Sequence, residues 1–180
     1  LPFAGGAIEK AQARSVAEFS RTSVEDALKP LGLELKKGVT GTTAVKQAFD
    51  KIDKVYEEIT PKLKIDDAAA LRDATVKSVK DSIEKIGLIT KGQQKEVNKY
   101  LKDIAELFGG DEITGKTFVK ADKIINKKAY QLTKFGQSAE NMEVGEILKS
   151  IQKGIRDELE RQNPAAAADY KKIRQSYERL

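Results

Sequence analysis

The sequence contains no cysteine and no histidine. Without a thiol or an imidazole, the chain cannot form a disulfide, a thiolate metal site, a cysteine nucleophile, a histidine general base or a Ser-His-Asp triad. A metal would have to be held by carboxylates alone. We therefore expect no enzymatic activity, no catalytic or metal-binding residue, no cofactor and no small-molecule substrate.

Long hydrophobic runs are missing as well. No stretch approaches the roughly 18 to 20 apolar residues that a membrane-spanning helix needs. No basic segment followed by an apolar one marks a signal peptide. The chain begins LPFAGGAIEK, without an initiator methionine, and ends at Leu180 inside a helical pattern. These features predict a fragment of a longer protein.

What the sequence does contain favours helices. Hydrophobic residues make up 39% of the chain and charged residues 34%, with only 4 prolines and no tryptophan. This mixture is typical of amphipathic helices, and apolar residues recur at the spacing of three and four that an α-helix produces. No segment alternates apolar and polar residues. We predict an all-α fold of six to seven helices in a mainly antiparallel bundle, without significant sheet.

Proline, glycine and capping residues separate the predicted helices. The helices cover approximately residues 7–29, 42–59, 67–86, 91–108, 115–134, 138–162 and 164–180. We expect a single helical domain over residues 1–180. The longer loop at residues 30–42 leaves open a separate first helix with a crossover loop, over residues 1–42.

Helix starts and buried faces follow from the same pattern. Expected caps are Thr42 or Thr43, Asp66 or Asp67, a capping box of Thr90 with Gln93, and Asn163 before Pro164. The first helix is expected to bury Ile8, Ala11, Val16, Phe19, Val24, Ala27 and Leu28. The third is expected to bury Leu71, Val76, Val79, Ile83 and Ile86.

Residues 110–117 read GDEITGKT and match the phosphate-binding pattern G-x-x-x-x-G-K-[ST]. A phosphate-binding loop of this kind joins a β-strand to a helix, but the preceding segment NKYLKDIAELF has helical spacing. Asp111 and Glu112 would also place two negative charges in an anion site. We interpret the segment as a junction in which Gly109 and Gly110 end one helix and Thr114 caps the next.

The helix after this junction carries a stripe of lysines. Lys116, Lys120, Lys123 and Lys127 are spaced four, three and four, so they share one face, while the opposite side carries Phe118, Ile125, Ala129 and Leu132. Such a stripe can contact an anionic partner, either nucleic acid or a membrane surface. It can equally be a solvated face that keeps the helix soluble. The net charge of +5 is modest for a dedicated nucleic-acid-binding protein.

Paired acids occur at Glu57-Glu58, Asp66-Asp67 and Asp157-Glu158. Neighbouring residues on a helix diverge by about 100°, so these carboxylates do not converge by themselves. We interpret them as caps and solvated positions.

Three segments resemble a known family. ARSVAEFSRTSVEDALKPLGLELKKGVTGTTAVKQAFDKIDKVYEEITPKL, ITGKTFVKADKIINKKAYQL and RDELERQNPAAAADYKKIRQSYERL resemble, in this order, the helical region of tail-end or internal virion proteins of short-tailed bacteriophages and prophages. The resemblance covers roughly residues 10–180. It implies a structural protein of DNA ejection, carried in the virion and made in the cytoplasm of the bacterial host. It supplies no site residue.

The leading hypothesis is therefore a non-enzymatic structural domain of a virion protein. Its expected partners are other virion proteins or further copies of itself, with DNA or the host envelope as additional candidates. One alternative is a basic nucleic-acid-binding module that uses the Lys116–Lys127 stripe. Others are a helical scaffold or adaptor with an apolar groove and, weakest, a carboxylate-dependent lytic enzyme.

Overall fold

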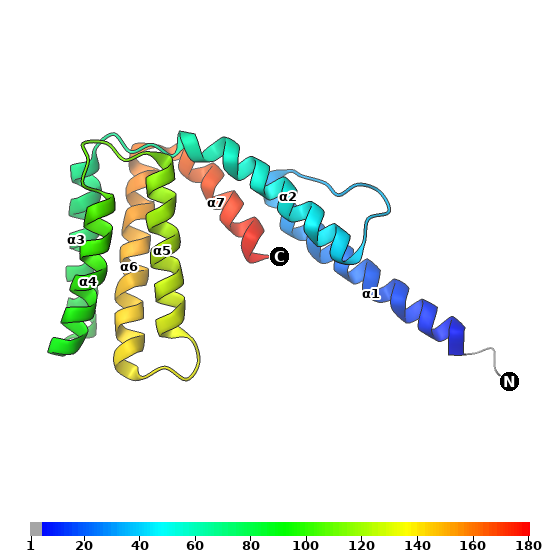
Figure 1. Cartoon of the computed structure of the whole chain (residues 1–180), viewed down its shortest axis with the longest axis horizontal. Helices are drawn as coiled ribbons and strands as arrows, with labels where there is room; N and C mark the ends of the chain where they lie inside the picture. Colours follow the sequence, from blue (N-terminus) through cyan, green and yellow to red (C-terminus); the bar gives the residue numbers. More distant parts are fainter. Residues whose placement is uncertain (1–4) are drawn as a thin grey trace. The chain divides into compact units, whose positions relative to one another are not determined.

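The computed structural model describes the backbone of residues 5–180 and the side chains of Lys10 and of residues 12–180. Within these residues the chain is all-α and forms no strand, which confirms the predicted fold class (Figure 1). Its α-helices are α1 (Gly5–Leu28), α2 (Gly41–Ile59), α3 (Ala68–Ile86), α4 (Lys91–Leu107), α5 (Gly115–Thr133), α6 (Ala139–Gln162) and α7 (Pro164–Glu178). Two short 3₁₀ turns, η1 (Lys29–Leu31) and η2 (Thr60–Lys62), follow α1 and α2.

Tertiary contacts divide the chain into two compact units. Unit 1 comprises Leu1–Ile59 and Asp169–Leu180, and unit 2 comprises Thr60–Ala168. Helices α1 and α2 belong to the same unit. The single domain over residues 1–180, with or without a separate first helix and crossover loop over residues 1–42, stays a prediction.

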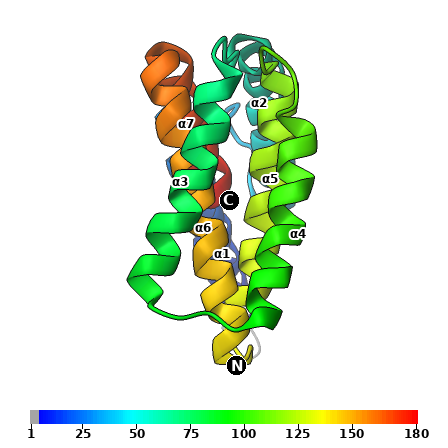
Figure 2. The same ribbon diagram turned by 90° about the vertical axis from the view of Figure 1, so that its left-hand side faces the viewer.

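Unit 2 contains the four-helix bundle α3–α6 (Figure 2). Helix α6 packs extensively against α3 and α5 and also contacts α4. The apolar residues that recur along it at helical spacing are all buried, namely Val144, Ile147, Leu148, Ile151, Ile155 and Leu159. The spacing of three and four in this helix therefore does produce a stripe that is covered on several sides.

Two glycines let α6 approach its neighbours closely. A Cβ atom at Gly145 would lie 2.4 Å from Cγ2 of Thr133 on α5. A Cβ atom at Gly154 would lie 2.0 Å from Oγ of Ser78 on α3. These separations are far below van der Waals contact, so a side chain at either position would force Thr133 or Ser78 to move.

The connection between α4 and α5 is tied to the segment before α3. Ile65 and Ile113 form an isolated antiparallel bridge, with N···O distances of 2.9 and 2.8 Å. The guanidinium of Arg72 donates to the carbonyl oxygens of Phe108 at 2.7 Å and Gly110 at 2.9 Å. The ends of two sequence-distant connections are thereby fixed to each other.

Unit 1 is built on the pairing of α1 with α2. Val24, Ala27 and Leu28 of α1 are buried, as are Ala44, Ala48 and Ile52 of α2. Arg21 holds the connecting loop by donating to the carbonyl oxygens of Lys36 at 3.2 Å and Val39 at 2.9 Å. Near the C-terminus, the Tyr177 hydroxyl donates to Asp53 of α2, and its ring lies 6.3 Å from that of Phe49.

Most predicted helix boundaries are confirmed. The capping box of Thr90 and Gln93 is present, Asp67 accepts from the Ala70 amide at 2.9 Å, and α7 begins at Pro164. The cap at Thr42 or Thr43 is wrong because α2 already begins at Gly41, which places both threonines inside its first turn.

Three expected core residues are exposed. Phe19 is 75% exposed, and Val16 and Val76 are also exposed. Phe19 lies nine residues before the buried Leu28, which puts the two side chains about 180° apart on the helix. Val76 lies about 140° from the buried Leu71 for the same reason. The expected burial of Ile8 and Ala11 falls on side chains outside the described residues.

Candidate functional site

The segment GDEITGKT forms a junction between two helices. Helix α4 ends at Leu107, the chain passes through Gly109 and Gly110, and the Thr114 hydroxyl caps α5 by accepting from the Thr117 amide at 3.2 Å. The element before the loop is a helix, so the strand required by a phosphate-binding loop is absent here. The predicted junction is confirmed.

The packing explains why this junction contains a glycine before Lys116. Gly115 is buried, and a Cβ atom there would lie only 1.7 Å from the carbonyl oxygen of Thr60 in η2. Of the two acidic residues, Glu112 pairs with Lys64 at 2.8 Å. A carbonyl oxygen beside the first turn of α5 and a carboxylate nearby both oppose phosphate binding at this position.

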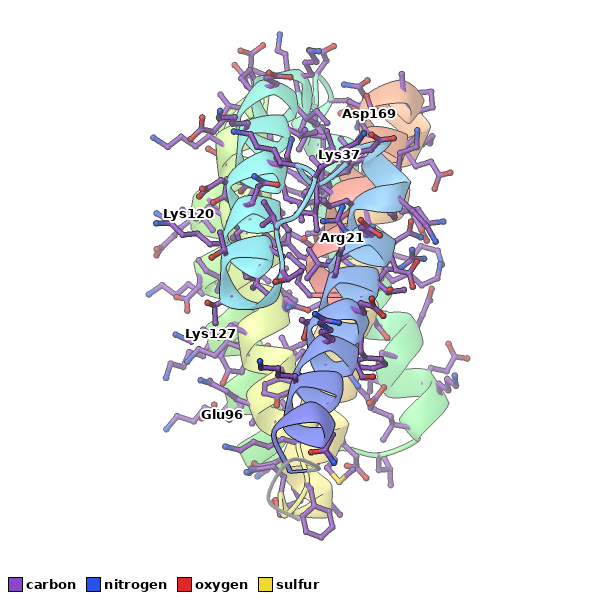
Figure 3. All side chains as sticks on the ribbon, turned by 90° about the vertical axis from the view of Figure 1, so that its right-hand side faces the viewer. Arg21, Lys37, Glu96, Lys120, Lys127 and Asp169 are labelled. Carbon is purple, nitrogen blue, oxygen red and sulfur yellow. The ribbon has the colours of Figure 1, made fainter. Side chains whose placement is uncertain are left out.

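The four predicted lysines do lie on one exposed face of α5. Lys116, Lys120, Lys123 and Lys127 are all exposed, whereas Phe118, Ile125 and Ala129 on the opposite side are buried and Leu132 is half-buried. Figure 3 shows Lys120 and Lys127 pointing outward on the same side, with Glu96 of α4 further along that side. We call these four residues the lysine face.

The charge pattern of α5 differs from that of its neighbours. The single carboxylate of α5, Asp122, is only 2% exposed. On α3 and α6, exposed lysines pair with acids one turn away, as in Lys77–Asp81, Lys149–Glu146 and Lys153–Asp157. Within the described residues, no carboxylate lies within 4.0 Å of Lys116, Lys120 or Lys127. Lys116, Lys120 and Lys127 therefore present positive charge that no acid of their own helix balances.

Behind the lysine face, Asp122 anchors α5 to α6. Arg156 donates from Nε to Oδ1 at 2.8 Å and from Nη2 to Oδ2 at 3.0 Å, and Gln152 donates to Oδ1 at 3.2 Å. Sequence reasoning missed this cluster. Its signal was an acid placed four residues after Phe118 and three before Ile125, on the apolar face of the helix.

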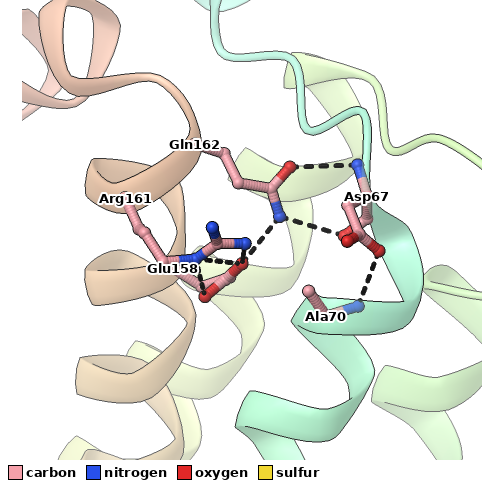
Figure 4. A network of polar contacts seen from close by, with 5 residues as sticks. All are labelled: Asp67, Ala70, Glu158, Arg161 and Gln162. Carbon is pink, nitrogen blue, oxygen red and sulfur yellow. Dashed lines mark hydrogen bonds and ion pairs between the residues drawn. The ribbon is translucent and has the colours of Figure 1, made fainter.

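Two of the three acid pairs, Asp66-Asp67 and Asp157-Glu158, have structural contacts. Asp67 caps α3, and its backbone exchanges two hydrogen bonds of 3.0 Å with the Gln162 side chain (Figure 4). Glu158 accepts from Arg161 and Gln162, and the Arg161 guanidinium is the main cause that lowers the pKa of this carboxyl. Glu57 and Glu58 are exposed.

Neither a metal site nor a membrane span stands out in the described part of the chain. No three acidic side chains there come together as metal ligands. No helix there is both long enough and apolar enough to cross a bilayer.

Comparison with known proteins gives no assignment. No protein-family model matches the sequence, and no curated protein or solved structure matches the chain. The resemblance to phage virion proteins and the role of the lysine face therefore stay predictions.

Proposed function

We propose that the chain is a non-enzymatic structural and interaction domain of a bacteriophage or prophage virion protein involved in genome delivery. In this proposal the protein is made in the bacterial cytoplasm and carried in the particle. Its partners are other virion proteins, further copies of itself, or the packaged DNA.

The observation that supports this proposal is where the three resembling segments lie. The first covers most of α1, the loop and α2, the second covers α5, and the third covers the end of α6 and all of α7. They contribute packing helices to both units. A resemblance distributed in this way favours a role in packing and assembly over a role in catalysis.

Mass spectrometry of purified particles tests the proposal. Particles from a phage or induced prophage that encodes the parent protein should contain peptides from residues 10–180 after nuclease treatment and density-gradient purification. A cytosolic host protein of similar abundance serves as the control for carry-over. Absence of the peptides from intact, infectious particles would refute the proposal.

A second candidate is a nucleic-acid-binding module, and the exposed charge of Lys116, Lys120 and Lys127 on one face of α5 favours it. From Lys116 to Lys127 the face extends about 16 Å along α5, since each residue advances the helix by about 1.5 Å. A rigid row of cations of that length can follow a phosphate backbone. Fluorescence anisotropy with a labelled DNA duplex at low ionic strength tests this candidate, and no binding under those conditions eliminates it.

A further inference from the structure

One end of the bundle in unit 2 is formed by two short connections. The α3–α4 connection and the α5–α6 connection lie at the same end (Figure 2). Next to them, the Gln93 side chain in the first turn of α4 joins the start of α6, since its Nε2 donates to the carbonyl oxygen of Glu140 at 3.1 Å and to Oε2 of Glu143 at 2.6 Å. The starts of α4 and α6, into which the two connections lead, are therefore in contact.

This end carries most of the exposed apolar side chains of unit 2. Leu88 in the first connection is 94% exposed, and Phe135 in the second is fully exposed. Tyr130 in the last full turn of α5 and Met142 near the start of α6 are exposed as well. Apart from these four, Val76 is the one exposed large hydrophobic residue of unit 2. We call Leu88, Tyr130, Phe135 and Met142 the apolar tip.

The backbone displays the two outermost side chains on defined turns. Leu88 follows Gly87, which has φ of +102° and closes α3 through a 2.9 Å hydrogen bond to the Ile83 carbonyl. Phe135 precedes Gly136, which has φ of +88°. Glycine adopts such positive φ values without strain. Both apolar side chains therefore project from capped helix ends.

Basic side chains flank both turns. Lys85 and Lys91 stand three residues before and three residues after Leu88, and Lys134 directly precedes Phe135; all three are exposed. The acids at this end, Glu84, Glu140 and Glu143, stand four, five and eight residues from the nearer of Leu88 and Phe135, so the lysines are the charges next to the two apolar side chains. Long lysine side chains can reach lipid phosphates while neighbouring apolar groups lie deeper.

We infer that the apolar tip inserts into the interface of a phospholipid bilayer that contains anionic lipid. The two outermost side chains stand on turns and are almost fully exposed, and a bilayer can take up such side chains without a matching groove. Exposed apolar groups, an interfacial tyrosine and flanking lysines are the features that such contact uses. The inference does not depend on the virion assignment or on the lysine face.

Flotation with vesicles tests the inference. The intact chain should bind vesicles of phosphatidylglycerol mixed with phosphatidylcholine more tightly than vesicles of phosphatidylcholine alone. The double variant Leu88→Ser/Phe135→Ser should bind the mixed vesicles about tenfold more weakly or less, because two apolar side chains no longer enter the lipid. Replacing Lys85, Lys91 and Lys134 with glutamine should weaken binding by up to about fivefold per lysine.

Two controls keep this result specific. Val76→Ser removes an exposed apolar side chain elsewhere in unit 2 and should leave binding unchanged. Glutamine at the four positions of the lysine face should leave most binding intact. No vesicle binding by the intact chain, or equal binding by the double variant, overturns the inference. Loss of binding only in the lysine-face variant also overturns it.

A fluorescent reporter gives an independent measurement. Because the chain contains no tryptophan, Phe135→Trp introduces a single indole at the tip. Its emission should shift to shorter wavelength when mixed vesicles are added, whereas Val76→Trp should not shift. A shift that depends on protein concentration and occurs without vesicles would indicate that the tip binds a second copy of the chain, and would contradict the inference.

Discussion

Asp122 of α5 and Arg156 of α6 form a two-pronged ion pair in which one partner is buried. The Asp122 side chain is 3% exposed and that of Arg156 is 25% exposed. The pair lies behind the lysine face, where it joins the two helices that pack most extensively in unit 2. The carboxylate of Asp122, the one acidic side chain of α5, is therefore buried, whereas the four lysines of the lysine face are exposed.

The first prediction concerns the two halves of this pair. Arg156→Met leaves a buried carboxylate without its cation and should lower the free energy of unfolding by about 2–3 kcal/mol. Replacing both residues together, as Asp122→Leu/Arg156→Met, should be less destabilising than the sum of the single changes, because no charge stays buried without a partner. Urea denaturation followed by circular dichroism measures all three variants. Additive effects would show that the two side chains are energetically independent.

The second prediction concerns Gly115. Since an added Cβ would lie 1.7 Å from the carbonyl oxygen of Thr60, Gly115→Ala should force α5 away from η2 and cost about 1–3 kcal/mol of stability. Gly92→Ala is the matched control, because the nearest atom to its Cβ, Oγ1 of Thr90, is 3.7 Å away. That change should be neutral or stabilising by up to about 1 kcal/mol. Similar melting temperatures for the two variants would contradict the close packing.

The architecture was largely predictable because helical spacing and capping are local. The capping box at Thr90, the cap at Asp67 and the stop at Gly87 each depend on residues within one turn. Burial was less predictable. The residues of α1 share faces by periodicity alone, but only contact with α2 decides that Leu28 is buried and Phe19 is exposed.

In the candidate site, too, the features set by local spacing were predictable and those set by tertiary packing were not. The direction of the four lysines follows from the period of α5, so sequence alone placed them on one face. The partner of Asp122 could not be found this way, because Arg156 is 34 residues away and the pairing depends on how α6 packs. The contact of Gly115 with Thr60 likewise joins residues that no local rule connects.

The third prediction concerns acid sensitivity at Glu158. Arg161 lowers the pKa of this carboxyl from its ordinary value of 4.5, with Gln162 adding to the effect and burial opposing it. A carboxyl whose pKa is lower in the folded state stabilises the fold above 4.5 and loses that contribution as the pH falls through the folded pKa. Glu158→Gln should therefore be less stable than the unmodified chain at pH 7, and the difference should shrink on acidification below pH 4.5. Urea titrations across this pH range measure the difference in free energy of unfolding. Glu160→Gln is the control, because it makes the same change in charge at an exposed position. A difference independent of pH would mean that the ion pair does not contribute.

The last prediction concerns the lysine face and DNA. If each of the four lysines neutralises one phosphate, replacing Lys116, Lys120, Lys123 and Lys127 with glutamine should reduce the slope of log K against log salt by about 3 to 4. The control replaces Lys77, Lys80, Lys149 and Lys153 on α3 and α6, which are also exposed. Both variants lower the net charge from +5 to +1 (5 − 4 = 1), so overall charge cannot explain a difference between them. Anisotropy titrations with one DNA duplex at several salt concentrations provide the slopes. Equal slopes for the two variants would show that any binding depends on overall charge and not on the lysine face. The lysine face would then be a solvated surface.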